Sequence, residues 1–244
     1  MRCVSYNIQY GIGLDRRYEI ARIADAVRGA DVIALQEVSR NNPMNGSHDM
    51  VAAIRASRNL LLPRSRSFDR LNFQRGALEA LIETPLGFVR FYSTHLDHRG
   101  ADERLAQVGF LKERILGFPL EGGALSGVAE MGFAEPPHTD AFVLMGDFNM
   151  LAGAPEYALL AGRPDHEFGT PLVANLAVDA AARLGQSGDN ATTWVDPKRP
   201  DDRTRWKRID YVFTSASLAA SLKSCQIDRE AVGSDHLPVW VEMG

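Results

Sequence analysis

Cysteine is scarce in this chain, and long hydrophobic runs are missing. The two cysteines among its 244 residues, Cys3 and Cys225, both lie in strand-like segments. This favours reduced core residues over a thiolate metal site, while a Cys3–Cys225 bridge stays open. No stretch comes near the roughly 20 apolar residues that a membrane-spanning helix needs. The first strand is predicted to begin at Arg2, which leaves no room for a signal peptide. We therefore expect a cytoplasmic protein without a transmembrane segment.

The chain also lacks a linker, an internal repeat and a strong net charge. No segment rich in Ser, Pro or charged residues divides it, and 45% of its residues are hydrophobic. A chain of this length and content can bury one large core, so we predict a single domain over residues 1–244. The net charge of −4 argues against a surface built throughout to bind nucleic acid.

One segment departs from this acidic average. Residues 197–208, PKRPDDRTRWKR, carry six Lys or Arg residues against two Asp residues and lead into the strand that contains Asp210. A solvated loop whose charges offset nearby acids is the ordinary interpretation of such a run. Its position beside Asp210, with Trp206 available for stacking, raises the alternative that it attracts an anionic substrate.

Hydrophobic patterning predicts strands and helices mixed along the whole chain. The strands are predicted near residues 2–9, 32–38, 74–84, 88–96, 141–149, 208–215, 222–229 and 237–243. The helices are predicted over residues 16–29, 48–58, 101–117 and 155–160, the last with Pro155 in its first turn. Strands that are apolar on both sides need helices to cover them. The economical α/β architecture is therefore two sheets packed face to face with helices outside.

Two segments do not fit this pattern. Residues 55–73 change from helix-like to strand-like without the turn chemistry that normally separates such elements. Residues 118–140 are rich in Gly, Ala and Pro and show no sustained period. We expect the second segment to be a surface excursion that serves as a lid or as a contact with another subunit.

Acids, amides and histidines recur where the predicted strands begin or end. A buried strand that ends in such a group places it at the rim of a sheet, where several rims can converge on one cation or phosphate. Surface charge does not usually distribute itself in this way, so the pattern predicts a metal-dependent phosphoesterase site. Its members are Asn7, Glu37, His95, Asp147, Asn149, Asp210, Asp235 and His236.

Glu37 ends the run VIALQE, where an uncompensated carboxylate would be unfavourable. An arginine such as Arg2 or Arg22 could compensate an isolated Glu. A cation is favoured here because several further oxygen ligands occupy similar positions in the sequence. An all-oxygen set suits Mg²⁺, with Mn²⁺ as a substitute, better than Zn²⁺.

The GDFN segment places two polar side chains close together. If the chain is extended there, Asp147 and Asn149 point to one face and Phe148 to the other. The carboxylate can then hold a metal or orient a water molecule, and the amide can donate to a phosphoryl oxygen. On its own, such a segment would more simply be a turn after a strand.

The segment SDHLPV supplies acid–base chemistry. His236 titrates near neutral pH when unperturbed, so it can accept a proton from water. Asp210 is the predicted carboxylate on its other ring nitrogen, and Asp235 is placed to reach the metal. A lone SDH segment would more often cap a helix or turn. A cap does not need one residue that reaches a metal, Asp235, beside another that acts as a base, His236.

The substrate contacts are predicted with less support from the pattern. His95 in STHLDH could donate a hydrogen bond to a non-bridging phosphate oxygen. For Arg75 and Arg104, a structural ion pair is the stronger alternative to a phosphate contact. The full set of predicted substrate-binding residues is Arg75, Arg104, Trp194 and Arg208.

Six motifs in this order resemble the endonuclease/exonuclease/phosphatase superfamily, the metal-dependent phosphoesterases related to deoxyribonuclease I. They are NIQYG, LQEV, STHLDH, GDFN, RIDYVF and SDHLPV, and they extend over almost the whole chain. The resemblance implies a four-layer αββα sandwich in which two mixed sheets pack together with helices outside. It also implies that Glu37 and Asn7 hold the catalytic Mg²⁺, with Asp235 close by.

The same resemblance implies roles for the remaining residues. Asp147 and Asn149 would position the nucleophile and the phosphate, and His95 would contact the scissile phosphate. The proton would be handled by the pair Asp210 and His236. Gln9 stands where the apurinic-site endonucleases of the superfamily carry an Asp, which disfavours repair of abasic sites.

The activity that we predict is hydrolysis of a phosphoester, most simply a phosphodiester, by in-line attack of an activated water molecule. The substrate could be single-stranded nucleic acid or a lipid or inositol head group. Two alternatives stay open. One is a phosphomonoesterase that acts on a phosphoinositide or a small phosphate ester, and the other is a catalytically silent binding module of the same fold.

Overall fold

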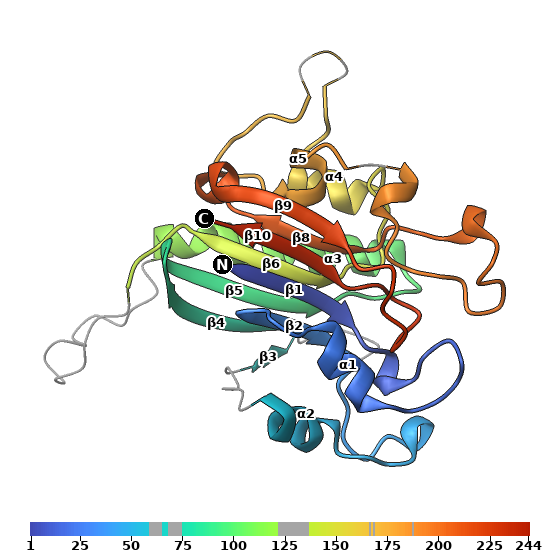
Figure 1. Cartoon of the computed structure of the whole chain (residues 1–244). Coiled ribbons are helices and arrows are strands. Elements are labelled where there is room, and N and C mark those ends of the chain that lie inside the picture. Colours follow the sequence, from blue (N-terminus) through green and yellow to red (C-terminus); the bar gives the residue numbers. More distant parts are fainter. Residues whose placement is uncertain (59–64, 68–74, 122–136, 166, 168, 187) are drawn as a thin grey trace, which may run out of the picture.

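Two β-sheets lie at the centre of the computed structural model, which describes residues 1–58, 65–67, 75–121, 137–165, 167, 169–186 and 188–244 (Figure 1). The four-stranded sheet has the order β2-β1-β10-β9. In it, β1 pairs in parallel with β2 and antiparallel with β10, and β9 pairs antiparallel with β10. The strands are β1 (Arg2–Asn7), β2 (Val32–Gln36), β9 (Leu222–Ile227) and β10 (Val239–Met243).

The second sheet has six strands in the order β3-β4-β5-β6-β8-β7. Only the central pair, β5 with β6, is parallel, and every other described pairing in this sheet is antiparallel. The strands are β3 (Ser65–Ser67), β4 (Gly76–Thr84), β5 (Gly87–His95), β6 (Phe142–Asp147), β7 (Val178–Asp179) and β8 (Asp210–Thr214).

Helices cover the outer faces of both sheets and complete four layers (Figure 1). Val4 and Tyr6 of β1 pack against Ile23 of α1 and Met50 of α2 on one side. On the other side, aromatic residues of β6 and β8 pack against α3 and α4. The helices are α1 (Ile20–Ala26), α2 (Met50–Arg58), α3 (Ala101–Glu121), α4 (Pro155–Ala161) and α5 (Ala180–Arg183).

The space between the two sheets is filled by small and branched apolar side chains. Residues of β1 and β10, such as Cys3 and Val241, share this core with Val143 of β6. Cys3 and Cys225 both align with Val241 of β10, so two strand spacings, roughly 10 Å, separate them. That separation is too large for a disulfide, and both cysteines are free and buried.

The predicted α/β sandwich is confirmed, and each predicted strand and helix has a counterpart. The helix expected at 101–117 continues to Glu121, with Pro119 in its last turns. The short elements β7 and α5 were not predicted because two to four residues are too few to show a period. The expectations for 55–73 and 118–140 lie largely outside the described residues. No helix in the described part of the chain is long and apolar enough to cross a membrane.

Candidate active site

The strand ends that carry the predicted polar residues meet at one edge of the two packed sheets. β1 ends at Asn7, β5 at His95 and β6 at Asp147. β8 and β10 are antiparallel to β6 and β1, so the start of β8 at Asp210 and the residue His236 before β10 lie at the same edge. The register places His95 opposite Asp147, and Asp147 opposite Asp210.

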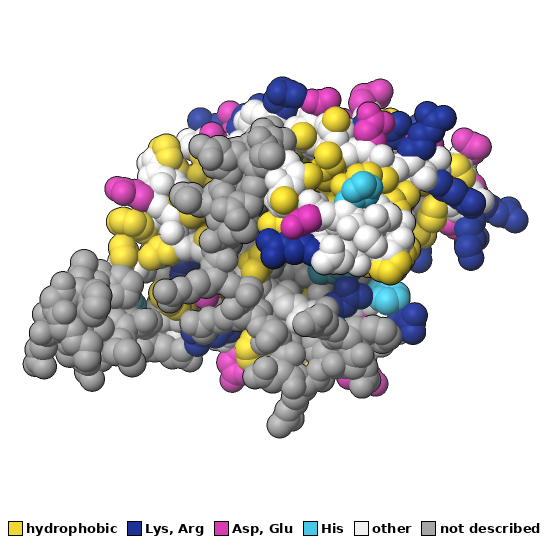
Figure 2. Space-filling view, turned by 90° about the horizontal axis from the view of Figure 1, so that it is seen from below, with side chains coloured by type: hydrophobic (Ala, Val, Ile, Leu, Met, Phe, Trp, Pro, Cys, Tyr) yellow, Lys and Arg dark blue, Asp and Glu magenta, His cyan; other side chains and the backbone are white. Residues whose placement is uncertain are grey.

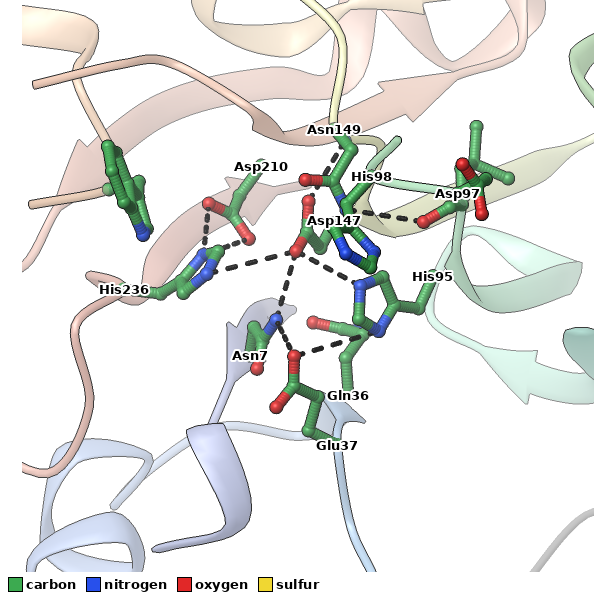
Figure 3. A network of polar contacts seen from close by, with 12 residues as sticks. Asn7, Gln36, Glu37, His95, Asp97, His98, Asp147, Asn149, Asp210 and His236 are labelled. Carbon is green, nitrogen blue, oxygen red and sulfur yellow. Dashed lines mark hydrogen bonds and ion pairs between the residues drawn. The ribbon is translucent and has the colours of Figure 1, made fainter. Parts of the chain in front are cut away.

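Asp147 is the centre of this group (Figure 3). Its carboxylate is buried, with 2% of the residue exposed. Its Oδ2 atom accepts a hydrogen bond of 2.9 Å from the side-chain amide of Asn7. The same oxygen lies 3.3 Å from Nε2 of His95 and 3.8 Å from Nε2 of His236. Side chains from both sheets therefore converge on one carboxylate oxygen.

Asn7 links this carboxylate to Glu37. Its Nδ2 atom donates to Glu37 Oε1 at 3.1 Å as well as to Asp147, while its Oδ1 accepts from the backbone N–H of Gln9. Glu37 follows β2 in a left-handed conformation, with φ of 61°. A non-glycine residue in that region is strained, and such strain is concentrated at functional sites.

The arginines considered as partners of Glu37 lie elsewhere. Arg22 forms ion pairs with Asp15 and Glu19, and the Arg2 guanidinium lies over the ring of Trp240. Neither of these arginines accounts for the partly buried carboxylate of Glu37.

His236 is held by a buried chain of hydrogen bonds. Its Nδ1 atom lies 2.9 and 3.1 Å from the two carboxylate oxygens of Asp210. The hydroxyl of Thr193 donates to Asp210 Oδ2 at 2.7 Å, and it accepts from the backbone N–H groups of Ile209 and Asp210. The pairing of His236 with Asp210 agrees with the sequence prediction. Thr193 was missed, because a single threonine before a basic loop carries no recognisable signal.

Asp235 and Trp194 form a second contact beside His236. The indole N–H of Trp194 donates to Asp235 Oδ2 at 3.1 Å. The hydroxyl of Ser234 donates to the backbone carbonyl of Asn7 at 2.8 Å and fastens this loop to the end of β1. Trp194, which was predicted to contact substrate, therefore lies within the site and orients one of its carboxylates.

The GDFN segment turns where an extended chain was expected, so that prediction is wrong. Asn149 is left-handed, with φ of 50°. Its backbone N–H donates to Asp147 Oδ1 at 2.9 Å, and its side-chain amide donates to the carbonyl of Leu96 at 3.2 Å. Phe148 points into the core beneath α3 and α4. The turn lets the residue after Phe148 fix the orientation of the Asp147 carboxylate.

Two of the arginines predicted to bind substrate have partners within the protein. Arg104 pairs with the buried carboxylate of Glu156 at 3.0 Å. Arg208 pairs with Asp179 and lies over the ring of Tyr211. Both guanidinium groups compensate buried acids within the protein, and their contact with substrate stays a prediction.

Arg75 lies close to the site. Its Nη2 atom is 2.9 Å from Nδ1 of His98. Burial, followed by the charge of Arg75, lowers the pKa of His95 to about 3. His95 is therefore a neutral imidazole near neutral pH, and one of its ring nitrogens can donate a hydrogen bond.

The other ionisable groups of the site repel or attract one another at short range. Burial raises the pKa of Asp147 to about 7, and the charge of Asp210 acts in the same direction. Burial also raises the pKa values of Glu37 and Asp235. For His236, burial alone would lower the pKa, but the charge and hydrogen bond of Asp210 outweigh it and raise the pKa to about 10.

The donor set fits a divalent cation. Four carboxylates crowd this edge of the sheets, and mutual repulsion among them contributes to the raised pKa values of Glu37, Asp147 and Asp235. Ligand atoms of Asp147, Asp210 and His236 lie within 4.8 Å of one another, and this set differs from the predicted metal ligands Asn7, Glu37 and Asp235. Oxygen-rich clusters of this kind suit hard cations such as Mg²⁺. In this structure Asn7 turns its amide nitrogen, which cannot coordinate a metal, towards the carboxylates.

Comparisons with known proteins agree with this geometry. A search of curated protein sequences found no match. Among solved structures, an endonuclease/exonuclease/phosphatase from Bacteroides vulgatus aligns with a TM-score of 0.66 at 18% identity, over 100% of this chain and 98% of the other. TDP2 from D. rerio, complexed with single strand DNA product, aligns with a TM-score of 0.65 at 17% identity, over 100% and 98% of the two chains.

A mannosyl-6-phosphatase from Bacteroides thetaiotaomicron aligns with a TM-score of 0.61 at 17% identity, over 100% of this chain and 99% of the other. At these identities, the structural matches establish the αββα fold alone. The sequence itself matches the family model described as the Endonuclease/Exonuclease/phosphatase family over residues 4–236. The chain therefore belongs to the endonuclease/exonuclease/phosphatase family.

Proposed function

We propose that this protein is a Mg²⁺-dependent phosphodiesterase that hydrolyses its substrate by in-line attack of water. The observation that carries the proposal is the convergence of Asn7, His95 and His236 on the buried carboxylate of Asp147. A hydrophobic core does not require a buried carboxylate surrounded by polar side chains, whereas a site that activates water beside a phosphate does.

Glu37 and Asp235, with Asn7, are the residues that we propose to hold Mg²⁺, with Mn²⁺ as a substitute. When bound, the ion would polarise a phosphoryl oxygen and neutralise developing negative charge. Asn7 could join the ligand set through Oδ1 once that atom exchanges its hydrogen bond with Gln9.

The protein's own groups divide the remaining work. Asp147, whose pKa is raised to about 7, can orient a water molecule and accept its proton. His236 is positively charged at neutral pH because of Asp210, so it suits the stabilisation of phosphate charge better than proton removal, the role expected from the sequence. Neutral His95 can donate to a non-bridging oxygen.

The preference for a diester rests on the basic loop before β8, whose six Lys and Arg residues lead into the strand that begins at Asp210. The D. rerio relative was solved with single strand DNA product, and the B. thetaiotaomicron relative is a mannosyl-6-phosphatase. Hydrolysis of a phosphomonoester is therefore the second candidate function.

The test compares bis(p-nitrophenyl) phosphate with p-nitrophenyl phosphate in the presence of Mg²⁺, Mn²⁺ or EDTA. We expect the diester to be hydrolysed faster, and only with a divalent ion. The His236→Ala variant should lose roughly 10²- to 10³-fold in rate, the usual range for removal of a group that stabilises developing charge. Glu37→Ala should lose activity and its response to the metal.

Circular dichroism would verify that both variants fold. A folded His236→Ala protein with undiminished activity would contradict the assignment of that residue. Faster cleavage of the monoester would select the phosphatase alternative. Absence of hydrolysis with any phosphate ester would indicate a binding module.

A further inference from the structure

A surface hollow lies beside the candidate active site, on the face formed by the basic loop. It encloses about 80 Å³ and is lined by Asn190, Thr192, Arg203, Trp206 and Arg229. Figure 2 shows Lys and Arg side chains gathered at one end of the molecule, the end at which the loop before β8 projects in Figure 1. The described lining residues supply two guanidinium groups, a hydroxyl, an amide and one aromatic ring.

The arginines of the hollow are oriented by their neighbours. The Arg203 guanidinium lies over the ring of Trp206, 5.4 Å from its centroid. The Trp206 indole is itself fixed by donating to the carbonyl of Pro200 at 3.1 Å. Arg229 Nη2 lies 3.5 Å from the hydroxyl of Thr192. Planar guanidinium groups match the oxygens of a phosphate group.

The hollow is joined to the active site by a short segment of chain. Thr192 lines the hollow, the Thr193 hydroxyl donates to Asp210, and the Trp194 indole donates to Asp235. Three consecutive residues therefore connect the hollow to two carboxylates of the site.

We propose that this hollow binds a phosphate of a single-stranded nucleic acid, one or two nucleotides away from the phosphate at Asp147. Arg203 and Arg229 hold the phosphate oxygens, and Trp206 stacks against the neighbouring base. This inference rests on the proposed phosphodiesterase function and narrows its substrate class. It gives part of the basic loop a specific role, although the whole chain is acidic.

Binding can be measured without turnover, by fluorescence anisotropy with a labelled oligothymidylate of about eight nucleotides in EDTA. The variants are Arg203→Gln and the double variant with Arg229→Gln. Arg199→Gln is the matched control, because it removes the same charge from an exposed position in the same loop and does not line the hollow. Thermal melting would verify that each variant is folded.

We expect Arg203→Gln to weaken binding roughly 5- to 10-fold and to lower the slope of log K against log salt concentration by about 0.7, the value for one contact to a single strand. Arg199→Gln should bind like the wild type. A strand with neutral methylphosphonate linkages should bind the wild type and Arg203→Gln equally weakly, because only the phosphate charge distinguishes them.

Equal affinity of wild type and Arg203→Gln for the ordinary strand would overturn the inference, as would an equal loss in Arg199→Gln. Inositol hexakisphosphate and unlabelled strand are compared as competitors at equal concentrations of phosphate groups. If inositol hexakisphosphate displaces the labelled strand at the lower concentration, the hollow is assigned to inositol phosphates instead. Hydrolysis of bis(p-nitrophenyl) phosphate by the wild type distinguishes failure of the proposed function from failure of the inference about the hollow. If the wild type does not hydrolyse this diester, the proposed function is rejected. If it does, and Arg203→Gln binds the strand as tightly as the wild type, only the assignment of the hollow is rejected.

Discussion

The side chains around Asp147 are themselves oriented by hydrogen-bond partners within the protein. Thr193 shows this most clearly, since its buried hydroxyl bonds the carboxylate that holds His236. Asn149 and Trp194 play comparable roles for Asp147 and Asp235. Such positioning groups are commonly worth 10- to 100-fold in activity at sites of this kind.

Replacement of Thr193 should therefore impair both stability and activity. In Thr193→Val, Asp210 loses a hydrogen bond to a charged acceptor, which costs roughly 1.5–3 kcal/mol. We expect kcat/KM to fall by about 10-fold or more, as for other positioning residues. Urea denaturation and diester hydrolysis would measure the two effects.

The matched control is Thr214→Val at the end of β8, the strand that begins at Asp210. The Thr214 hydroxyl is also buried, but it has no hydrogen-bond partner among the described residues. Its replacement should be neutral or stabilising. Thr193→Ser, which keeps the hydroxyl, should recover most of the activity. If Thr193→Ser behaved like Thr193→Val, packing of the methyl group and not the hydrogen bond would be responsible.

The charge of Asp210 should set the pH range of activity. Its negative charge raises the pKa of His236 to about 10, so neutral Asn in Asp210→Asn should lower that pKa. If the imidazolium is the active form, the alkaline limb of the kcat/KM profile moves to lower pH in the variant. A shift of the acid limb instead would mean that neutral His236 is required. His236 would then be the general base, as predicted from the sequence.

At the element scale, the site depends on how closely β5 and β6 approach. Thr94 of β5 aligns with Gly146 of β6, and His95 with Asp147. A Cβ atom at Gly146 would lie 2.0 Å from the backbone oxygen of Thr94. No side-chain rotation can relieve a clash with backbone, so this pair of strands requires glycine at the position before Asp147.

Gly146→Ala should accordingly separate the strands and displace Asp147. Overpacking typically costs roughly 1–3 kcal/mol, and we expect at least about 3 kcal/mol here because the added Cβ meets the backbone of Thr94. Activity should be lost even where the protein still folds. Chemical denaturation and diester hydrolysis would measure these effects.

Gly153→Ala is the control, since a Cβ there meets nothing within 4 Å. We expect it to retain wild-type stability and activity. A Gly146→Ala protein as stable and active as Gly153→Ala would show that the strands can shift without cost, and that their spacing does not position the site.

At the scale of the whole molecule, two packed sheets hold carboxylates together that repel one another. The raised pKa values of Glu37, Asp147 and Asp235 mean that their ionised forms oppose folding at pH values above those pKa values. Without a cation, stability should therefore increase as the pH falls through about 7, where Asp147 takes up a proton.

Millimolar Mg²⁺ should raise the melting temperature of the wild type at pH 8, because it binds the folded state and compensates this repulsion. Glu37→Gln should melt higher than the wild type in EDTA, since a buried charge is removed, and should gain less from Mg²⁺. Each kcal/mol corresponds to about 2–4 °C in a chain of this size. Calorimetry with and without Mg²⁺ would decide, and equal Mg²⁺ responses in both proteins would exclude Glu37 as a ligand.

Much of this arrangement could be predicted from local pattern. Strand ends bearing Asn7, His95, Asp147 and Asp210 were expected at one rim, and the structure brings them there. Left-handed turns were not predictable, since Asn149 bends the chain through contacts with Asp147 and Leu96 that exist only after folding. The same holds for Arg104 and Arg208, whose acidic partners are far away in sequence.

The sequence by itself determined the longer strands and helices, the α/β class and the family, because hydrophobic period and ordered motifs are local properties of the chain. Only the tertiary structure decided which groups share a hydrogen bond or a charge. Thr193 reaches Asp210, Trp194 reaches Asp235, and the pKa of His236 is raised, because antiparallel strands bring distant segments to one buried edge. At such an edge burial strengthens every electrostatic interaction, and no local pattern records that effect.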